Sequence, residues 1–151
     1  MSVSPNHAFN LGPIDQVAYV VEDLDRALPH YAALFGPFNV NEYALQGLLS
    51  RGTSIDCRLK IATSQSGPIE IELIQVVEGE TLHSEHLRRH GEGLHHVRFR
   101  VDDVDATLAA LTQAGYEALL YKRFTPTLAF AYLATPDVQG RSVIELFESR
   151  A

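Results

Sequence analysis

Four residues of the chain have types and spacing that could bind a metal ion. Gln16 and His96 occupy matching places roughly 80 residues apart. Glu72 and Glu145 each stand between aliphatic residues near the end of their own half of the chain. One imidazole nitrogen and three oxygen atoms suit a divalent ion of borderline or hard character, with positions left open for water or substrate. The sequence therefore predicts a metal site if the fold brings these side chains together.

An internal repeat indicates how the fold could do so. Residues 96–105 (HVRFRVDDVD) match residues 16–25 (QVAYVVEDLD), apolar with apolar and acid with acid. Each segment has the pattern of a strand, an acidic corner and the start of a helix. Each half of the chain also ends on Ile-Glu-Leu, at 71–73 and at 144–146. Two copies of one supersecondary unit are therefore predicted.

The alternation of side chains along a strand places the polar residues of the repeat on one face. Val97, Phe99 and Val101 are expected to face the helix of their unit, so His96 and Arg98 point to the opposite face of the sheet. The same alternation places four more polar residues on that face: Gln16, Glu70, Glu72 and Glu145. Pairing of the two curved units would make these side chains converge.

Each half is expected to form a strand, a helix and three further strands. In the first half the strand covers residues 14–21, and the helix begins at Asp23 or Asp25 and ends before Gly36. Pro29 is expected to delay or bend this helix, because past the first turn proline deletes a helix hydrogen bond. The other strands of this half are expected at residues 38–45, 57–63 and 69–76.

The second half repeats this order after a short polar helix, which is expected to lie exposed at residues 81–89. Its elements are a strand at 95–101, a helix that begins at Asp103 or Asp105, and strands near 117–122, 128–134 and 142–147. The predicted fold class is α+β, with two tandem βαβββ modules that form a curved mixed sheet around a central cavity. We expect a lead-in at 1–13 and a single domain at 14–151, divided into module one (14–77), a connector (78–92) and module two (93–148).

Composition limits the classes of protein to consider. The 151 residues, 46% of them hydrophobic, are enough for one domain with a sizeable core. A formal net charge of -7 argues against a nucleic-acid partner, because a phosphate backbone requires a basic face. Cys57 is the only cysteine, which excludes an internal disulfide. No apolar run is long enough to span a membrane and no secretion signal is recognisable, so we expect a cytoplasmic protein without membrane contacts.

The paired units and three motifs resemble the vicinal oxygen chelate superfamily. The motifs are Ile-Asp-Gln-Val-Ala at 14–18, Gly-Glu-Gly-Leu-His-His-Val at 91–97 and Val-Ile-Glu-Leu at 143–146. That superfamily includes glyoxalase I, methylmalonyl-CoA epimerase, extradiol dioxygenases and bleomycin resistance proteins. The resemblance implies one divalent ion per site (zinc, cobalt, nickel or manganese), a small-molecule substrate and a homodimer. Carried over residue by residue, it places the metal ligands at Gln16, Glu72, His96 and Glu145.

The resemblance implies that the metal polarises a carbonyl while a carboxylate takes the proton from the adjacent carbon. Glu145 is the candidate for a ligand that also moves protons, and Glu70 for a second base. The Gly-Glu-Gly-Leu-His-His run looks like methylmalonyl-CoA epimerase, although that enzyme usually has histidine at the place of Gln16 and often glutamine at that of Glu72. We therefore expect an isomerase or epimerase acting on an acyl thioester or a 2-oxo acid. The ligand set itself looks like that of glyoxalase I, a lactoylglutathione lyase, which is the first alternative.

Arg98 and three aromatic residues indicate how a substrate would be held. Arg98, one pleat beyond His96, is predicted to reach into the cavity and bind a substrate carboxylate in a bidentate manner. Phe130 and Tyr132, with Phe147, predict an apolar or aromatic pocket.

Three other interpretations stay open. Arg98 could pair with Glu145 or Glu72 in a metal-free cavity, and the chain would then be a small-ligand binder of the bleomycin resistance type. An extradiol dioxygenase is disfavoured, because its iron requires two histidines and one carboxylate. A further set, His83, His86 and His90, has helical spacing and could imitate a second metal site, although an exposed connector helix explains it. His95 is expected to serve packing.

Overall fold

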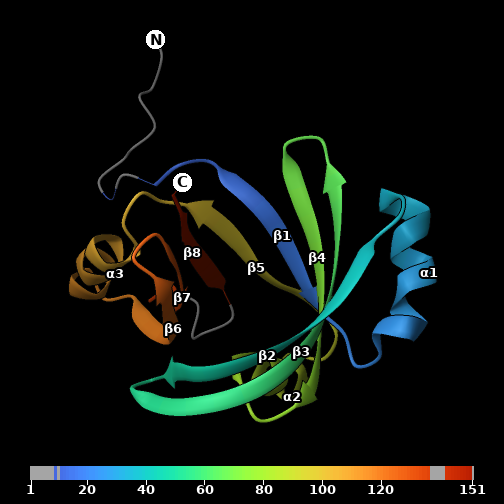
Figure 1. The fold of residues 1–151 in the computed structure, drawn as a ribbon, viewed down its shortest axis with the longest axis horizontal. Coiled ribbons are helices and arrows are strands. Elements are labelled where there is room, and N and C mark those ends of the chain that lie inside the picture. The colour runs from blue at the N-terminus through green and yellow to red at the C-terminus, as the bar shows by residue number, and fades with distance from the viewer. Residues whose placement is uncertain (1–8, 10, 137–141, 151) are drawn as a thin grey trace.

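The computed structural model describes residue 9, residues 11–136 and residues 142–150, and it shows two similar units (Figure 1). The first unit comprises β1 (Ile14–Val20), α1 (Leu24–Phe35), β2 (Asn39–Ser50), β3 (Thr53–Ser66) and β4 (Ile69–Glu78). The second comprises β5 (Gly93–Arg100), α3 (Val104–Gln113), β6 (Glu117–Thr125), β7 (Leu128–Ala134) and β8 (Val143–Ser149). The connector contains α2 (Leu82–His90). Most of the predicted lead-in, 1–13, lies outside the described residues.

The strands close into one barrel within a single chain, in the order β1-β4-β3-β2-β6-β7-β8-β5. β1 pairs in parallel with β4, β5 pairs in parallel with β8, and β1 and β5 join the two units in antiparallel orientation. On the other side the units meet where Leu49 and Ser50 of β2 pair with Tyr121 and Leu120 of β6. α1 and α3 cover the outside of the barrel on opposite sides (Figure 1). The predicted α+β fold of two tandem βαβββ modules is confirmed, and its curved sheet is closed.

Side-chain alternation separates the barrel interior from the layers under the helices. Ala18 of β1 belongs to the interior cluster, whereas its neighbour Tyr19 packs under α1. On β4, Ile74 likewise faces the interior and Leu73 faces α1. The predicted face assignment for these strands is therefore confirmed.

α1 begins after Asp23, whose side chain accepts a hydrogen bond from the N–H of Arg26 at 3.3 Å. The prediction that Pro29 would delay the start of this helix is wrong, since α1 runs without interruption from Leu24 to Phe35. Leu24 is fully buried against β3 and β4. Packing of this apolar face outweighs the single hydrogen bond that the proline removes.

α3 begins in the same way, because Asp103 rather than Asp105 accepts a hydrogen bond from the N–H of Ala106 at 3.0 Å. Replacing Asp103 with alanine is expected to lower the free energy of unfolding by about 1 kcal/mol, since the helix loses its N-cap. Chemical denaturation of the purified protein measures this. The control is Asp102→Ala, which removes an equal charge from the exposed neighbouring position and should change stability by less than about 0.5 kcal/mol.

β2 and β3 are longer than predicted, because Gly47 does not end a strand. The pairing of β2 with β3 shifts register between Leu45 and Leu48, and Gly47 has a φ of 65°. The backbone therefore makes a bulge there and both strands continue. No helix in the described part of the chain is both long and apolar enough to cross a bilayer.

Candidate functional site

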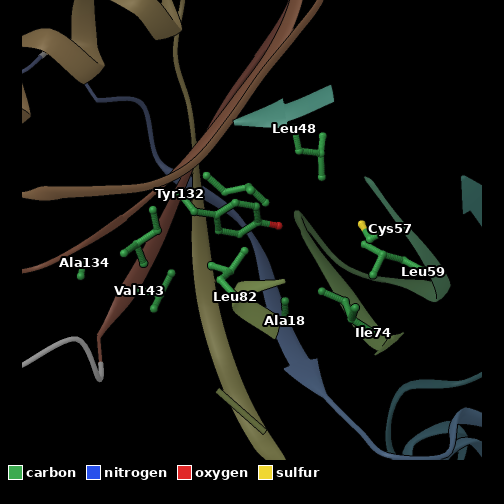
Figure 2. Packing of buried hydrophobic residues seen from close by; sticks show 11 residues of the cluster. Ala18, Leu48, Cys57, Leu59, Ile74, Leu82, Tyr132, Ala134 and Val143 are labelled. Atoms are coloured by element: carbon green, nitrogen blue, oxygen red, sulfur yellow. The ribbon is translucent and has the colours of Figure 1, made fainter. Parts of the chain in front are cut away.

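The barrel encloses a cavity of about 520 Å³. Its lining is mainly apolar and aromatic, and Figure 2 shows Tyr132 directing its hydroxyl into this interior toward the wall that carries Cys57 and Leu59. Among the described residues, no lysine or arginine lines it. The polar lining consists of one histidine, two threonines, two tyrosines and three glutamates: His83, Thr63, Thr81, Tyr43, Tyr132, Glu70, Glu72 and Glu145.

The four residues singled out in the sequence come together on one wall of the barrel. They lie on the adjacent strands β4, β1, β5 and β8, so one chain supplies them all. His96 Nε2 is 3.0 Å from Gln16 Oε1, 3.1 Å from Glu145 Oε1 and 3.9 Å from Glu72 Oε1. Nitrogen and oxygen ligands about 2.1 Å from one ion lie about 3 Å from each other. His96 Nε2 already has that spacing from one oxygen of Gln16 and one of Glu145.

Within the described residues, no group of three or more His, Cys, Asp and Glu side chains is arranged to hold an ion. The set around His96 is not such a group, because one of its donors is the amide oxygen of Gln16 and because Glu72 Oε1 lies 3.9 Å from His96 Nε2. Glu72 would have to approach for all four atoms to share an ion. The donor types, one imidazole nitrogen, one amide oxygen and two carboxylates, nevertheless fit a divalent metal.

The charge state of these groups also fits a cation. The pKa of both Glu72 and Glu145 is raised to about 8, mainly by burial and, for Glu72, also by the neighbouring carboxylate of Glu145. Burial lowers the pKa of His96 to about 3, so the imidazole is neutral at pH 7. The two carboxyl groups are thus held partly protonated when no ion is present. A bound divalent ion would stabilise the ionised form of both.

Comparisons with known proteins agree with the fold. The family described as the glyoxalase/bleomycin resistance protein/dioxygenase superfamily matches residues 15–130. The chain belongs to this superfamily. The predicted resemblance to vicinal oxygen chelate proteins is thereby confirmed.

Similar solved structures include three proteins of this superfamily's fold. Hypothetical protein BH1468 from Bacillus halodurans C-125 is 19% identical, with 92% of this chain and 95% of that chain covered and a TM-score of 0.67. The methylmalonyl-CoA epimerase of Mycobacterium tuberculosis is 22% identical, with 91% and 88% covered and a TM-score of 0.61. A variant of the Streptomyces coelicolor methylmalonyl-CoA epimerase, in complex with 2-nitronate-propionyl-CoA, is 25% identical, with 93% and 96% covered and a TM-score of 0.64. No curated protein matches the sequence.

Glu70 orients Gln16 in this superfamily member. The amide nitrogen of Gln16 donates a hydrogen bond to Glu70 Oε1 at 2.7 Å, which leaves the amide oxygen directed at His96. Glu70, predicted as a second base, does line the cavity, but one of its oxygens already has this partner.

Replacing Glu70 with alanine is therefore expected to weaken metal binding by about tenfold, because a freed Gln16 amide can turn its nitrogen toward the site. Calorimetric titration with zinc measures the affinity. The Glu70→Gln variant keeps an oxygen acceptor at this position and should lose less. Equal losses in the two variants would contradict the orienting role.

Arg98 lies elsewhere than predicted. Its guanidinium donates to both carboxylate oxygens of Asp15, at 2.8 and 3.1 Å, and lies 4.5 Å from the centre of the Phe147 ring. Two residues of β1 oppose one of β5 between Ile14 and Gln16, so Asp15 sits in a bulge beside Arg98. The structure contradicts the expected position of Arg98 in the cavity, and its carboxylate partner is Asp15 rather than Glu145 or Glu72.

Tyr132 and Phe130 line the cavity as predicted. The Tyr132 ring packs edge-on against His96 with ring centres 4.8 Å apart. Burial holds the pKa of the Tyr132 hydroxyl well above its usual value, so the hydroxyl keeps its hydrogen. Tyr132 thus packs against the imidazole that sequence reasoning assigned to metal binding.

Two buried histidines next to this site were not expected. His95 was assigned to packing, but its Nδ1 lies 2.8 Å from His96 Nδ1. β5 bulges at His95, because Ala18 pairs with His96 and the next residue, Tyr19, pairs with Leu94. For His96 Nε2 to bind an ion, the ring hydrogen must be on Nδ1, which then donates it to His95 Nδ1. His95 therefore holds the ring of His96 in place.

The expectation that α2 lies exposed is wrong for its first turn. Leu82 and His83 are buried, and His83 lines the cavity. His86 and His90 instead border a second pocket on another side of the molecule, together with His95. The three histidines of α2 therefore do not converge on one point, which agrees with the interpretation that they form no second metal site.

Proposed function

We propose that this chain is a metal-dependent enzyme that enolises a carbonyl compound inside the barrel, as an isomerase or epimerase does. The observation that carries the proposal is the position of His96 Nε2 within 3.1 Å of both Gln16 Oε1 and Glu145 Oε1, with the partly buried carboxyl of Glu72 3.9 Å away. The similarity of the fold to two methylmalonyl-CoA epimerases supports the proposal. One zinc, cobalt, nickel or manganese ion per chain, a homodimer and a cytoplasmic location belong to the same proposal.

Each residue of the site has a role in this reaction. Gln16, Glu72 and His96 would hold the ion together with Glu145. The ion would supply a Lewis acid that makes the carbon next to the substrate carbonyl more acidic. Glu145 takes the proton from that carbon.

The proton must then return to the substrate. Glu145 can return it to the same face of the carbon, and Glu70 is the candidate donor for the other face, as an epimerase requires. The mainly apolar cavity excludes water during these transfers.

Solvent-exchange measurements test the proposal. Zinc-, cobalt-, nickel- and manganese-loaded protein is incubated in D₂O with methylmalonyl-CoA and with a panel of acyl thioesters, 2-oxo acids and neutral ketones, and deuterium at the carbon next to the carbonyl is followed by NMR. We expect exchange with at least one of these compounds, and a loss of about 100-fold or more in Glu145→Gln. Absence of exchange with every compound would contradict the proposal. A parallel assay with methylglyoxal and glutathione separates the glyoxalase I alternative.

A further inference from the structure

His83 carries an unpaired hydrogen-bonding atom at the wall of the barrel cavity. Among the described residues, the buried side-chain nitrogens and oxygens without a partner are His83 Nε2 and His95 Nε2. Of these two residues, His83 lines the cavity and His95 borders the second pocket. An unpaired buried polar atom costs roughly 1 to 3 kcal/mol, so it is rare unless a bound molecule supplies the partner.

The contact between His83 and Thr81 sets the role of the free nitrogen. His83 Nδ1 lies 3.2 Å from the hydroxyl oxygen of Thr81. Thr81 and Ser84 form a capping box at the start of α2, and we assign the hydrogen of the Thr81 hydroxyl to His83 Nδ1. If Nδ1 accepts this hydrogen, Nε2 must carry the ring hydrogen. The free atom is therefore an N–H group.

The ring of His83 is held rigidly beside the proposed reaction centre. It packs edge-on against Tyr132, with ring centres 5.5 Å apart, and against His95 at 4.8 Å. Tyr132 in turn contacts His96. His83 is 2% exposed, and burial lowers its pKa to about 3, so it offers a hydrogen bond without a positive charge.

Apart from the ion proposed above, the cavity offers no cation to a charged ligand. Arg98 is paired with Asp15 outside the cavity lining, and the other lining groups are neutral or acidic. A carboxylate placed there would lose its hydration and face Glu70, Glu72 and Glu145. A neutral molecule with an apolar body loses little hydration and is not repelled by these carboxylates.

We propose that the cavity binds an uncharged, largely apolar carbonyl compound and that His83 Nε2–H donates a hydrogen bond to one of its oxygen atoms. His83 is thus a positioning and specificity-determining residue. The inference rests on the function proposed above, since it names the substrate class of the same site.

The test uses three probes of similar shape and the metal-free protein, so that no ion can bind a carboxylate directly. Methyl benzoylformate is neutral and has carbonyl oxygens, benzoylformate is its carboxylate, and ethylbenzene has no acceptor. Affinities are measured by NMR titration of wild type, His83→Phe and His90→Phe, the last a control at an exposed position of the same helix. Protein labelled with ¹⁵N in its imidazoles reports the hydrogen on His83 Nε2.

In wild type and His90→Phe, the ester should bind at least tenfold more tightly than the carboxylate. In His83→Phe the ester should bind about five- to tenfold more weakly, while ethylbenzene changes by less than twofold. His83→Gln, which can again present an N–H group, should recover part of the loss. In wild type the His83 Nε2 resonance should move with the ester and stay unchanged with ethylbenzene.

Several results would overturn the inference: no binding of the ester at millimolar concentration, a carboxylate that binds as tightly as the ester, or an ester affinity unchanged in His83→Phe. If His83→Phe does not fold, the ¹⁵N resonance of wild type decides alone. Because no metal is present, these results are independent of the deuterium exchange experiment. Failure of that experiment, with ester binding as described, would disprove the enzyme but leave the neutral ligand site.

Discussion

Replacing His96 with alanine is expected to weaken binding of a divalent ion by more than about 100-fold. Its Nε2 is the atom that both Gln16 Oε1 and Glu145 Oε1 approach, so the variant loses the single nitrogen donor and the centre of the set. Outer-shell changes alone usually cost 10- to 100-fold in affinity, and loss of a direct ligand should cost more. Calorimetric titration with zinc, and the visible absorption of a cobalt-loaded sample, measure the effect.

His90→Ala is the matched control for this experiment. It also removes an imidazole, but from an exposed position at the end of α2, and should keep one ion per chain. Retention of the ion in His96→Ala would place the metal site elsewhere. Absence of binding in wild type would instead mean that the two buried carboxyl groups stay protonated and that the chain binds small ligands without a metal.

The repeat in the sequence was sufficient to predict which residues come together around His96. Strand alternation predicted the face of Gln16 and Glu72 from their own neighbours, and the second copy did the same for His96 and Glu145. Of the four, Glu72 and Glu145 line the cavity. Such reasoning works because a strand with one face under a helix cannot shift by one residue without exposing its apolar side chains. The pairing of the two copies within one chain was not predictable.

β-Bulges account for the contacts that the alternation of side chains along the strands did not predict. Each inserts one residue into a strand and reverses the faces on either side of it. The bulge at Asp15 brings its carboxylate to Arg98, and the bulge at His95 brings a second imidazole to His96. Neither position carries a glycine or proline that would have indicated a bulge.

His83 was missed for a different reason. The connector is polar, with a sequence of LHSEHLRRH, so its composition predicted exposure. Burial of its first turn depends on where the connector crosses the barrel, which is a long-range property. Thr81 is a residue type that caps helices, but nothing in the local sequence indicated that the ring of His83 would reach the cavity.

The metal-free protein is expected to lose stability as the pH rises from about 6.5 to about 8. Glu72 and Glu145 keep their protons in the folded state up to about pH 8, whereas in the unfolded chain they have lost them above their ordinary value of 4.5. The folded state thus binds more protons in this range, so the free energy of unfolding falls with pH, by up to about 1.4 kcal/mol per pH unit for each proton.

The buried histidines set the lower limit of this range. His83 and His96 have folded pKa values of about 3 against an ordinary 6.5, so between these values the unfolded chain binds more protons and stability rises with pH. Below about pH 6.5 the histidines therefore raise the free energy of unfolding with rising pH, while the two carboxyl groups lower it. Above that pH only the carboxyl contribution remains, and the melting temperature in EDTA should fall by several degrees up to pH 8.

Zinc should reverse the sign of this slope, because the ion binds the ionised carboxylates and its affinity grows as their protons leave. Melting temperatures measured from pH 6.5 to 8, in EDTA and with excess zinc, should therefore diverge with rising pH. Glu145→Gln removes one of the two titrating groups and should flatten the decline in EDTA. A metal-free melting temperature that rises over this range would mean that the two carboxyls are already ionised without a metal, and the electrostatic reason for a cation at His96 would be lost.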